Sequence, residues 1–434
     1  MLQASIREAD QIGVADQDVI LAGDHLPDGE LRGIDPGQLL EDAPADDLVA
    51  PLEAFAIDVE AEGFRAREDQ EALDLAGAQV KNFEAALSHY LDGRPVRVLS
   101  SATAALEVAL QLCGIGPGAE VITPSQTFFA APNMIAKAGA VPVFADVDLI
   151  SRNLDFDAVE RAITPRTRAI MPTHFAGLPV DMDRLYAIAR QHRLRVIEDA
   201  ALAIGSSWRG RRIGSFGDLT VFSFHPNKNM TAIEGGALVL NDETEAREVE
   251  ILRFHGITRL SDGTRDVTFP GGKFNLPDVN ARIGIGQLAR LDVFNAQRRE
   301  LVAAYFRQFP SSPPCLLPHP GYPGDEAGHS WNLFAPLLPL DRLTIDRQQF
   351  RAALEARGIG TGISYEAAHL TTLFRRYGHH DGELPNTERI AQETVTLPLF
   401  PAMTHADVER VCNTVGEVLA GHCLLPRERG EDLR

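Results

Sequence analysis

Short apolar strand patterns alternate with helical patterns from residue 96 to residue 200, and this alternation constrains the fold more than any other feature. The helical patterns place apolar residues at the 3.6-residue period, as in 103–112 and 182–194. Such alternation predicts an α/β fold with a mostly parallel central sheet and helices on both faces. The expected strands lie at 96–100, 120–124, 141–147, 168–174 and 195–200.

Two further strand patterns, 219–224 and 236–241, lie too close together for a crossover helix between them. We expect both in the same sheet, joined by a loop that carries Lys228. The pattern changes after residue 280. Residues 281–309 predict one long helix, which the Pro-rich stretch at 310–324 ends.

Charge and pattern together predict the domain organisation. Residues 1–75 contain 20 acidic and 4 basic residues, so they carry −16 of the net charge of −20. Because this segment is acidic, is interrupted by proline and glycine and has little periodicity, we expect a poorly ordered extension or a weakly structured cap. A large domain at 76–300, a smaller α+β domain at 301–425 and a tail at 426–434 are expected to follow.

Composition excludes several classes of partner. An acidic chain without a basic stripe argues against binding to nucleic acid. No apolar run reaches the roughly 18 residues of a membrane helix, and the first residues do not resemble a secretory signal, so we expect a cytoplasmic protein without membrane insertion. The four cysteines are scattered, which argues against disulfides and a zinc site; we expect no metal.

Polar residues gather where the expected strands end. Ser101–Thr103, Pro124–Phe128, His174, Asp199 and Ser223–Lys228 each follow a different strand. Ligands of open parallel sheets bind at the carboxyl ends of the strands. We therefore expect these residues to share one site.

Each of these residues has an ordinary explanation when taken alone. Thr103 follows a common helix cap, Asp199 could form a salt bridge, Phe128 could be a core residue, and most lysines such as Lys228 are surface charges. Together they provide an anion cradle, an aromatic face, a buried acid and an amine. This combination predicts a pocket for pyridoxal phosphate (PLP).

Several ordered segments resemble one known family. They include "SSATAAL", "GPGAEVITPSQTF", "VIEDAALAIGS", "GSFGDLTVFSFHPNKNMTAIEGGALV" and "HSWNLF". From about Leu75 to about Ala420 the chain resembles the DegT/StrS family of PLP-dependent sugar aminotransferases. The resemblance implies an aspartate-aminotransferase-like PLP domain (fold type I) with a smaller C-terminal domain.

The resemblance also implies roles for individual residues. Lys228 would form the Schiff base with the cofactor, and Asp199 would pair with its pyridine nitrogen. Ala102, Thr103 and Ser223 would hold the phosphate.

Two further roles follow from the same resemblance. Phe128 occupies the place of an aromatic residue that stacks on the cofactor ring. Asn275 corresponds to an asparagine that reaches the phosphate of the neighbouring subunit. This last role implies a homodimer with shared active sites.

The implied reaction moves an amino group from glutamate to a 4-keto nucleotide sugar. The cofactor would pass through pyridoxamine phosphate, so we expect ping-pong kinetics and release of 2-oxoglutarate. Ala102 and the segment "RGIGTGISYEAAH" are similar to the UDP-4-amino-4-deoxy-L-arabinose–oxoglutarate aminotransferases. That similarity favours a UDP-4-keto-pentose acceptor and a role in lipid A modification or polysaccharide biosynthesis. Another nucleotide-linked 4-keto-6-deoxy sugar is the alternative.

Several points depart from the family pattern. His174, His329 and His369 are candidates for substrate contacts, although a lone histidine is more often structural. Leu202 stands where the family usually has Gln or His beside the cofactor. Residues 1–75 do not match the usual beginning of relatives.

Three other interpretations stay open from the sequence. A dehydratase of the same family would carry histidine in place of Lys228. A degenerate relative could bind cofactor or a partner without catalysis. A nicotinamide enzyme is a poor fit, since Ala119 in "GIGPGA" replaces the last glycine of the dinucleotide motif.

Overall fold

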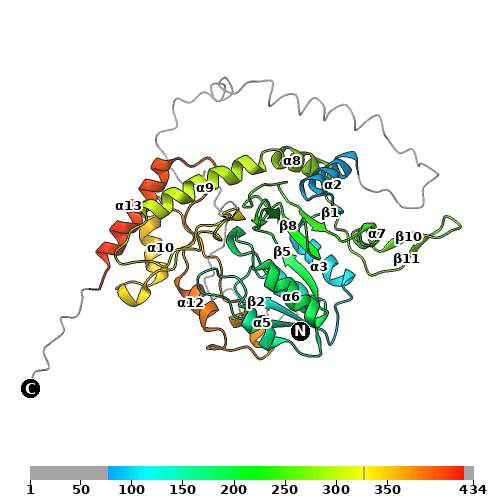
Figure 1. The fold of residues 1–434 in the computed structure, drawn as a ribbon, viewed down its shortest axis with the longest axis horizontal. Helices are drawn as coiled ribbons and strands as arrows, with labels where there is room; N and C mark the ends of the chain where they lie inside the picture. Colours follow the sequence, from blue (N-terminus) through cyan, green and yellow to red (C-terminus); the bar gives the residue numbers. More distant parts are fainter. Residues whose placement is uncertain (1–76, 326–327, 425–434) are drawn as a thin grey trace, which may run out of the picture. The chain divides into compact units, whose positions relative to one another are not determined.

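A seven-stranded sheet with the order β1-β9-β8-β5-β4-β2-β3 organises the chain (Figure 1). The structure is a computed structural model that describes residues 77–325 and 328–424, so the expectations for residues 1–75 and for the tail at 426–434 lie outside it. β9 runs antiparallel to both of its neighbours and the other pairs are parallel, which confirms the predicted α/β class with a mostly parallel sheet. The strands are β1 (Val96–Leu99), β2 (Glu120–Pro124), β3 (Val141–Ala145), β4 (Thr167–Ile170), β5 (Arg195–Asp199), β8 (Leu219–Ser223) and β9 (Gly236–Val239).

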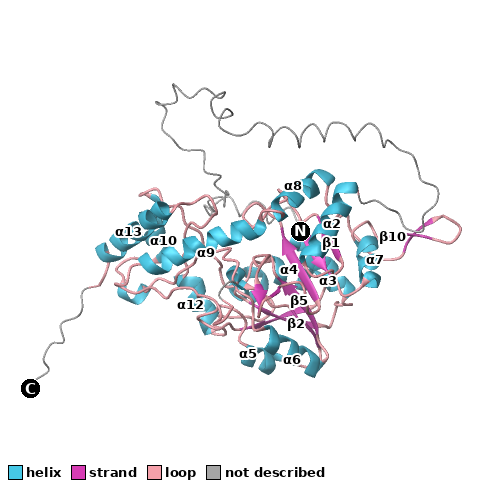
Figure 2. Ribbon diagram, turned by 45° about the horizontal axis from the view of Figure 1, so that its top comes forward, coloured by secondary structure: helices cyan, strands magenta, loops and turns pink. Residues whose placement is uncertain are grey.

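Helices cover both faces of this sheet. Neighbouring residues of a strand point to opposite faces, so Val196 enters one apolar core and Ile197 the other. α5 and α6 lie side by side at the bottom of Figure 2, and α2 packs with α8 at its top. One face carries α2 (Ala78–Tyr90), α5 (Phe156–Ala162), α6 (Met182–His192) and α8 (Asp278–Leu288); the other carries α3 (Ala102–Leu112), α4 (Ala130–Lys137) and α7 (Glu243–Leu252).

The long helix predicted at 281–309 is wrong, because the structure has two helices there. α8 ends at Leu288 and α9 (Leu291–Gln308) begins three residues later. A Cβ atom on Gly284 would lie 2.5 Å from the Phe83 ring, so α8 is pressed closely onto α2. The chain turns after this contact, and α9 runs away from the sheet (Figure 1).

The C-terminal part has its own apolar core. This core joins the second half of α9 to α10 (Arg347–Glu355) and α13 (His405–Gly421). Among its described residues, the extended segments pair through isolated bridges, such as Leu316 with Leu337. The expected domain boundary at residue 300 falls inside α9, so the division at that point stays a prediction.

Short elements complete the described chain. No helix in the described ranges is long and apolar enough to cross a membrane. The short elements are β6 (Ser207–Trp208), β7 (Arg211–Arg212), β10 (Ile257–Arg259), β11 (Arg265–Val267), α11 (Thr372–Arg375), α12 (Pro385–Glu393) and the 3₁₀ turns η2 (Phe175–Gly177), η4 (Leu340–Arg342) and η5 (Ala368–Leu370).

A buried ion pair closes the outer edge of β1. Arg253 Nη1 lies 2.6 Å from Glu84 Oε1, and the two side chains are 6% and 11% exposed. Arg253 also donates to the Val98 carbonyl, and the Val98 amide donates to Glu84. The pair thus satisfies backbone groups of an edge strand that would otherwise be unpaired.

Replacing Glu84 by alanine should lower the free energy of unfolding by about 3–5 kcal/mol, because Arg253 would remain as a buried, unpaired charge. The control is Glu107→Ala, which removes the surface pair with Lys137 and should cost less than about 1 kcal/mol. Urea unfolding of both variants measures the difference. Equal losses would contradict the assignment.

Candidate active site

A cavity of about 220 Å³ opens at the carboxyl edge of the sheet, where the sequence predicted the site. Asp199 is the last residue of β5 and Ser223 the last residue of β8. Tyr365 adds one wall from the C-terminal part of the chain. Six predicted site residues line the cavity together: Ala102, Thr103, Phe128, Asp199, Ser223 and Lys228.

The first turn of α3 forms one end of this cavity. Ser101 caps the helix by accepting a hydrogen bond from the Ala104 amide at 3.1 Å. In the described part of the chain, the amides of Ala102 and Thr103 have no acceptor. Free first-turn amides together with the helix dipole make this end suited to an anion such as phosphate.

A glycine allows the sheet to approach this helix start. A Cβ atom on Gly236 would lie 2.4 Å from the Ala102 nitrogen, which is too close for any other residue. Gly236 also pairs with Ser223 across β8 and β9. This contact brings the Ser223 hydroxyl and the α3 amides to the same end of the cavity.

The loop between β8 and β9 holds Lys228 firmly. The next residue, Asn229, is 4% exposed. Its side chain donates to Asn295 Oδ1 at 2.7 Å and to the Ser330 carbonyl at 2.8 Å, and it accepts from Asn332 Nδ2 at 2.8 Å. A lysine in a mobile loop would point in many directions, whereas here the backbone beside Lys228 is fixed.

Lys228 and Asp199 perturb each other inside the cavity. Burial lowers the pKa of the Lys228 amine, and the charge of Asp199 opposes this shift. Burial raises the pKa of the Asp199 carboxyl, while the Ala201 amide, Lys228 and His174 oppose that shift. Within residues 77–325 and 328–424, no carboxylate lies within 4.0 Å of the Lys228 amine. The cavity therefore holds an amine that deprotonates readily and an acid that needs a cationic partner.

Lys228 is also singled out by the scarcity of lysine. The chain contains four lysines: Lys81, Lys137, Lys228 and Lys273. Lys137 pairs with Glu107 on the surface, and Lys273 donates to Asn275 and lies over the Phe254 ring. Of the four, Lys228 alone lines the cavity.

The sequence model of the DegT/DnrJ/EryC1/StrS aminotransferase family matches residues 58–416. The chain belongs to this family. The match begins upstream of Leu75, the residue at which the resemblance was placed from sequence. As a member of the family, the protein is a PLP-dependent enzyme that transfers an amino group to a sugar.

Solved structures of the family share the fold. DesV of S. venezuelae, solved with a ketimine intermediate, is 34% identical with a TM-score of 0.76, over 86% of this chain and 95% of DesV. DesI, solved with its TDP-sugar product, is 31% identical with a TM-score of 0.72, over 79% and 85% of the two chains. A proposed sugar aminotransferase of Streptococcus pneumoniae in its PMP form is 29% identical with a TM-score of 0.74, over 80% and 93%.

The residues at the site fit PLP, the cofactor of the family. The unpaired amides of Ala102 and Thr103 suit its phosphate, and Gly236 keeps that end open to the backbone. Asp199 is 5% exposed and accepts a hydrogen bond from one amide, so its buried charge suits a protonated ring nitrogen. Lys228 supplies the amine.

Asn275 lies outside the cavity lining of its own chain. Its backbone bridges to Leu99, and its side chain accepts a hydrogen bond from Lys273 at 2.8 Å. Its expected contact is with a second subunit, so this contact stays a prediction.

The three candidate histidines also lie outside the cavity lining and are buried in the protein. His174 accepts from the Val180 amide at Nδ1, so Nε2 donates to Glu198 at 3.0 Å. His329 stacks on Trp331 with ring centroids 3.7 Å apart, and burial lowers its pKa. His369 contacts Ser125 and Glu388. Their expected contacts with substrate stay predictions.

Sequence reasoning gave no individual role to several cavity residues, although Thr127 and His225 lie within ranges that it placed at the site. Thr127 and Thr173 follow β2 and β4 and contact each other at 2.8 Å, so their position after strands was a usable signal. His225 and Glu234 come from the Lys228 loop. Tyr365 could not be placed, because it follows no strand of the sheet. Leu202 lines the cavity, at the position where the resemblance implies a residue beside the cofactor.

Replacing Asp199 by asparagine should raise the stability of the cofactor-free protein at pH 7. The folded state raises the pKa of Asp199, so its stabilising contribution is complete below the unfolded pKa of about 3.9 and is lost as the pH rises through the folded pKa. Thermal unfolding measures the gain, which should shrink toward about pH 4. A variant less stable than wild type at pH 7 would contradict the assignment.

Proposed function

We propose that the protein transfers the amino group of glutamate to the C4 keto group of a nucleotide sugar, with Lys228 and Asp199 as its catalytic residues. The observation that carries this proposal is the meeting of Lys228, Asp199 and the free α3 amides in one cavity. The family membership supports the reaction class.

Each residue has a defined task in this proposal. When bound, PLP supplies an electron sink and a carbonyl that carries the amino group between the two substrates. Ala102, Thr103 and Ser223 would hold its phosphate, and Phe128 would face its ring. Asp199 keeps its negative charge and would hold the ring nitrogen protonated.

Lys228 moves the proton. Burial lowers the pKa of its amine, which favours the neutral form that can act as a base. The Lys228 Nζ atom would take a proton from the amino-bearing carbon of glutamate and pass it to the cofactor carbon that receives the amino group. With the acceptor bound it would move a proton in the opposite direction, to C4 of the sugar. Because Asn229 fixes the adjacent backbone, the amine stays within reach of both substrates in turn.

The proposal also names the keto sugar that accepts the amino group. The resemblance in sequence favours a UDP-4-keto-pentose as the acceptor. The enzyme would then act in lipid A modification or polysaccharide biosynthesis, and we expect it in the cytoplasm. The TDP-sugar product of DesI, at 31% identity, supports a TDP-linked 4-keto-6-deoxy sugar as the second candidate. Both acceptors belong in one assay panel.

A second subunit would complete the site. Glutamate carries two carboxylates, yet among the described residues the cavity lining offers only Lys228 and His225 as basic side chains. Asn275 lies beside Lys273 outside the cavity. A homodimer in which Asn275 reaches the partner's phosphate would bring further polar groups to each site.

Glutamate added without acceptor should convert the bound cofactor to pyridoxamine phosphate and release an equal amount of 2-oxoglutarate. Absorbance spectra and 2-oxoglutarate assay measure the two events, and initial rates with each acceptor should give parallel double-reciprocal lines. Lys228→Ala should lower the rate of this half-reaction by at least about 1,000-fold. A wild-type enzyme with bound PLP and no 2-oxoglutarate release would disprove the function.

Mixing two impaired variants tests the shared site. In a mixed dimer of Lys228→Ala with Asn275→Ala, one of the two sites regains both wild-type residues if Asn275 acts on the partner. Random mixing should therefore restore about a quarter of wild-type activity. If Asn275 acts within its own chain, the mixture should be no more active than its two components.

A further inference from the structure

The chain segment that carries Tyr365 is anchored on both sides of this residue by the end of β2. On one side, Gln126 Nε2 donates to the Ser364 carbonyl at 3.1 Å. On the other side, the Ser125 carbonyl accepts from the Ala368 amide at 3.2 Å, and Ser125 Oγ accepts from the His369 amide at 3.0 Å. Two adjacent residues thus hold the segment from 364 to 369 against the sheet.

Tyr365 reaches the cavity between these two anchors. Its ring meets Phe128 edge-on with centroids 6.0 Å apart, and it meets Phe175 in the same way at 6.2 Å. Burial raises the pKa of its hydroxyl, and the charge of Asp199 adds to this shift. Tyr365 therefore forms a wall near the catalytic acid, and any shift of its backbone would change the shape of the site.

His369 joins this segment to two other elements through both ring nitrogens. Its Nδ1 atom lies 2.7 Å from Ser125 Oγ, and its Nε2 atom lies 3.3 Å from Glu388 Oε1 in α12. The Glu388 carboxylate can only accept, so Nε2 carries a proton. Nδ1 in the neutral ring then accepts the hydroxyl proton of Ser125. One neutral tautomer satisfies both contacts.

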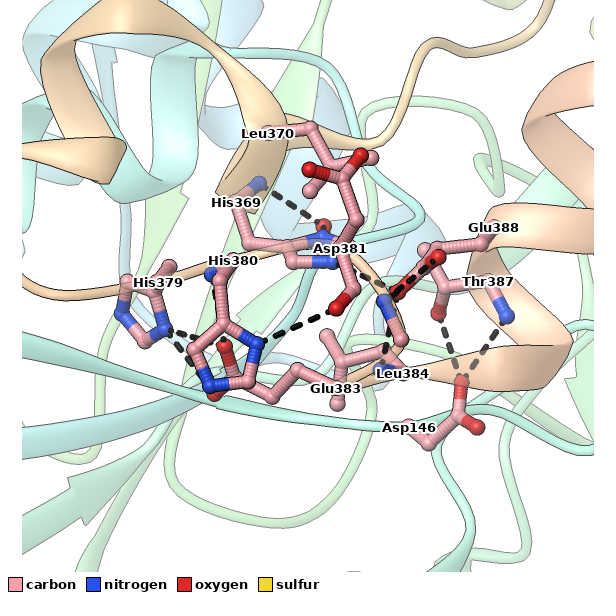
Figure 3. Close-up of polar contacts among 12 residues, drawn as sticks. Asp146, His369, Leu370, His379, His380, Asp381, Glu383, Leu384, Thr387 and Glu388 are labelled. Atoms are coloured by element: carbon pink, nitrogen blue, oxygen red, sulfur yellow. Dashed lines mark hydrogen bonds and ion pairs between the residues drawn. The ribbon is translucent and has the colours of Figure 1, made fainter.

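Backbone amides just before α12 hold the Glu388 carboxylate in place beside His369 (Figure 3). The Gly382 and Leu384 amides donate to the Glu388 carboxylate, the Gly382 amide at 2.8 Å and 2.9 Å. Asp146, just after β3, accepts from the Asn386 and Thr387 amides and holds the start of α12. α12 is thus an anchored support.

The charged groups around His369 leave the ring neutral. Burial lowers the pKa of His369, while Glu388 and Glu383 oppose this shift and His379 adds to it. Asp381 pairs with Arg375 at 2.8 Å. His379 contacts Glu383 at 3.0 Å (Figure 3), so each of these groups has a partner of its own. The hydrogen bond between Ser125 and His369 does not make Ser125 a catalytic residue, because its side chain is fully buried and does not line the cavity.

We propose that His369 is a positioning residue, which sets Tyr365 in the cavity wall against Phe128 by bridging Ser125 and Glu388. Tyr365 in turn is a specificity-determining residue that contacts the sugar acceptor. This inference rests on the proposed function, because it assigns the acceptor side of the same site.

Two substitutions of His369 separate its two contacts. Asparagine places a polar atom near the Nδ1 position and can still accept from Ser125. Glutamine reaches toward the Nε2 position and can still donate to Glu388. Because Ser125 holds the segment itself, His369→Gln should lower kcat/KM for the acceptor about 10-fold, and His369→Asn less than about 3-fold. A larger loss in His369→Asn than in His369→Gln, or no loss in either variant, would overturn the proposal.

A double-mutant cycle with Tyr365→Ala tests whether His369 acts through Tyr365. If it does, His369→Gln should change acceptor kcat/KM less than about 2-fold in the Tyr365→Ala background. His329→Gln is the matched control: it also alters a buried neutral histidine, and any loss it causes should be the same in both backgrounds. Losses of His369→Gln and Tyr365→Ala that multiply would overturn the proposal.

The half-reaction with glutamate distinguishes a failure of the proposed function from a failure of the role proposed for His369. Release of 2-oxoglutarate by wild type shows that the proposed function stands, and the variants are then compared on acceptor turnover per folded, PLP-loaded site. Thermal unfolding reports the stability lost in each variant. An effect of His369→Gln on stability alone, with acceptor kcat/KM unchanged, would show His369 to be merely structural and overturn the inference.

Discussion

The burial of Asp199 at the end of β5 is the constraint on which the rest of the site depends. A carboxylate that is 5% exposed and accepts a hydrogen bond from one amide is costly unless a cation meets it. Lys228 lies in the same cavity but forms no close ion pair with it. Folding therefore places the Asp199 carboxylate and the Lys228 amine in one cavity without a close ion pair between them. A ligand with a protonated ring nitrogen would offset the free-energy cost of burying the Asp199 charge.

The backbone places the other groups around this acid. The reversal from β8 to antiparallel β9 sends the Lys228 loop back over the strand that neighbours β5, and Asn229 fixes that loop to the α9 side of the molecule. Gly236 lets β9 approach the start of α3. One topological reversal and one residue without a side chain thus unite the amine, the acid and the anion end.

The sequence was most informative where local pattern and topology agree. Strand ends could be predicted because apolar runs stop at polar residues, and parallel strands bring those ends together; Thr103, Asp199, Ser223 and Lys228 meet for this reason. The break between α8 and α9 could not, because the helical period continues through it and no proline stands between Leu288 and Leu291. Tyr365 could not be placed either, since contacts distant in sequence, from Ser125 and Gln126, position it.

The most direct test of the central assignment locates the amine that carries the cofactor. Purified protein loaded with PLP is reduced with borohydride, digested and mapped by mass spectrometry. The chain has four lysines, so the candidates are few. We expect the pyridoxyl group on Lys228 and its loss in Lys228→Ala. A pyridoxyl group on Lys81, Lys137 or Lys273, or none on any lysine of a PLP-loaded protein, would contradict the account.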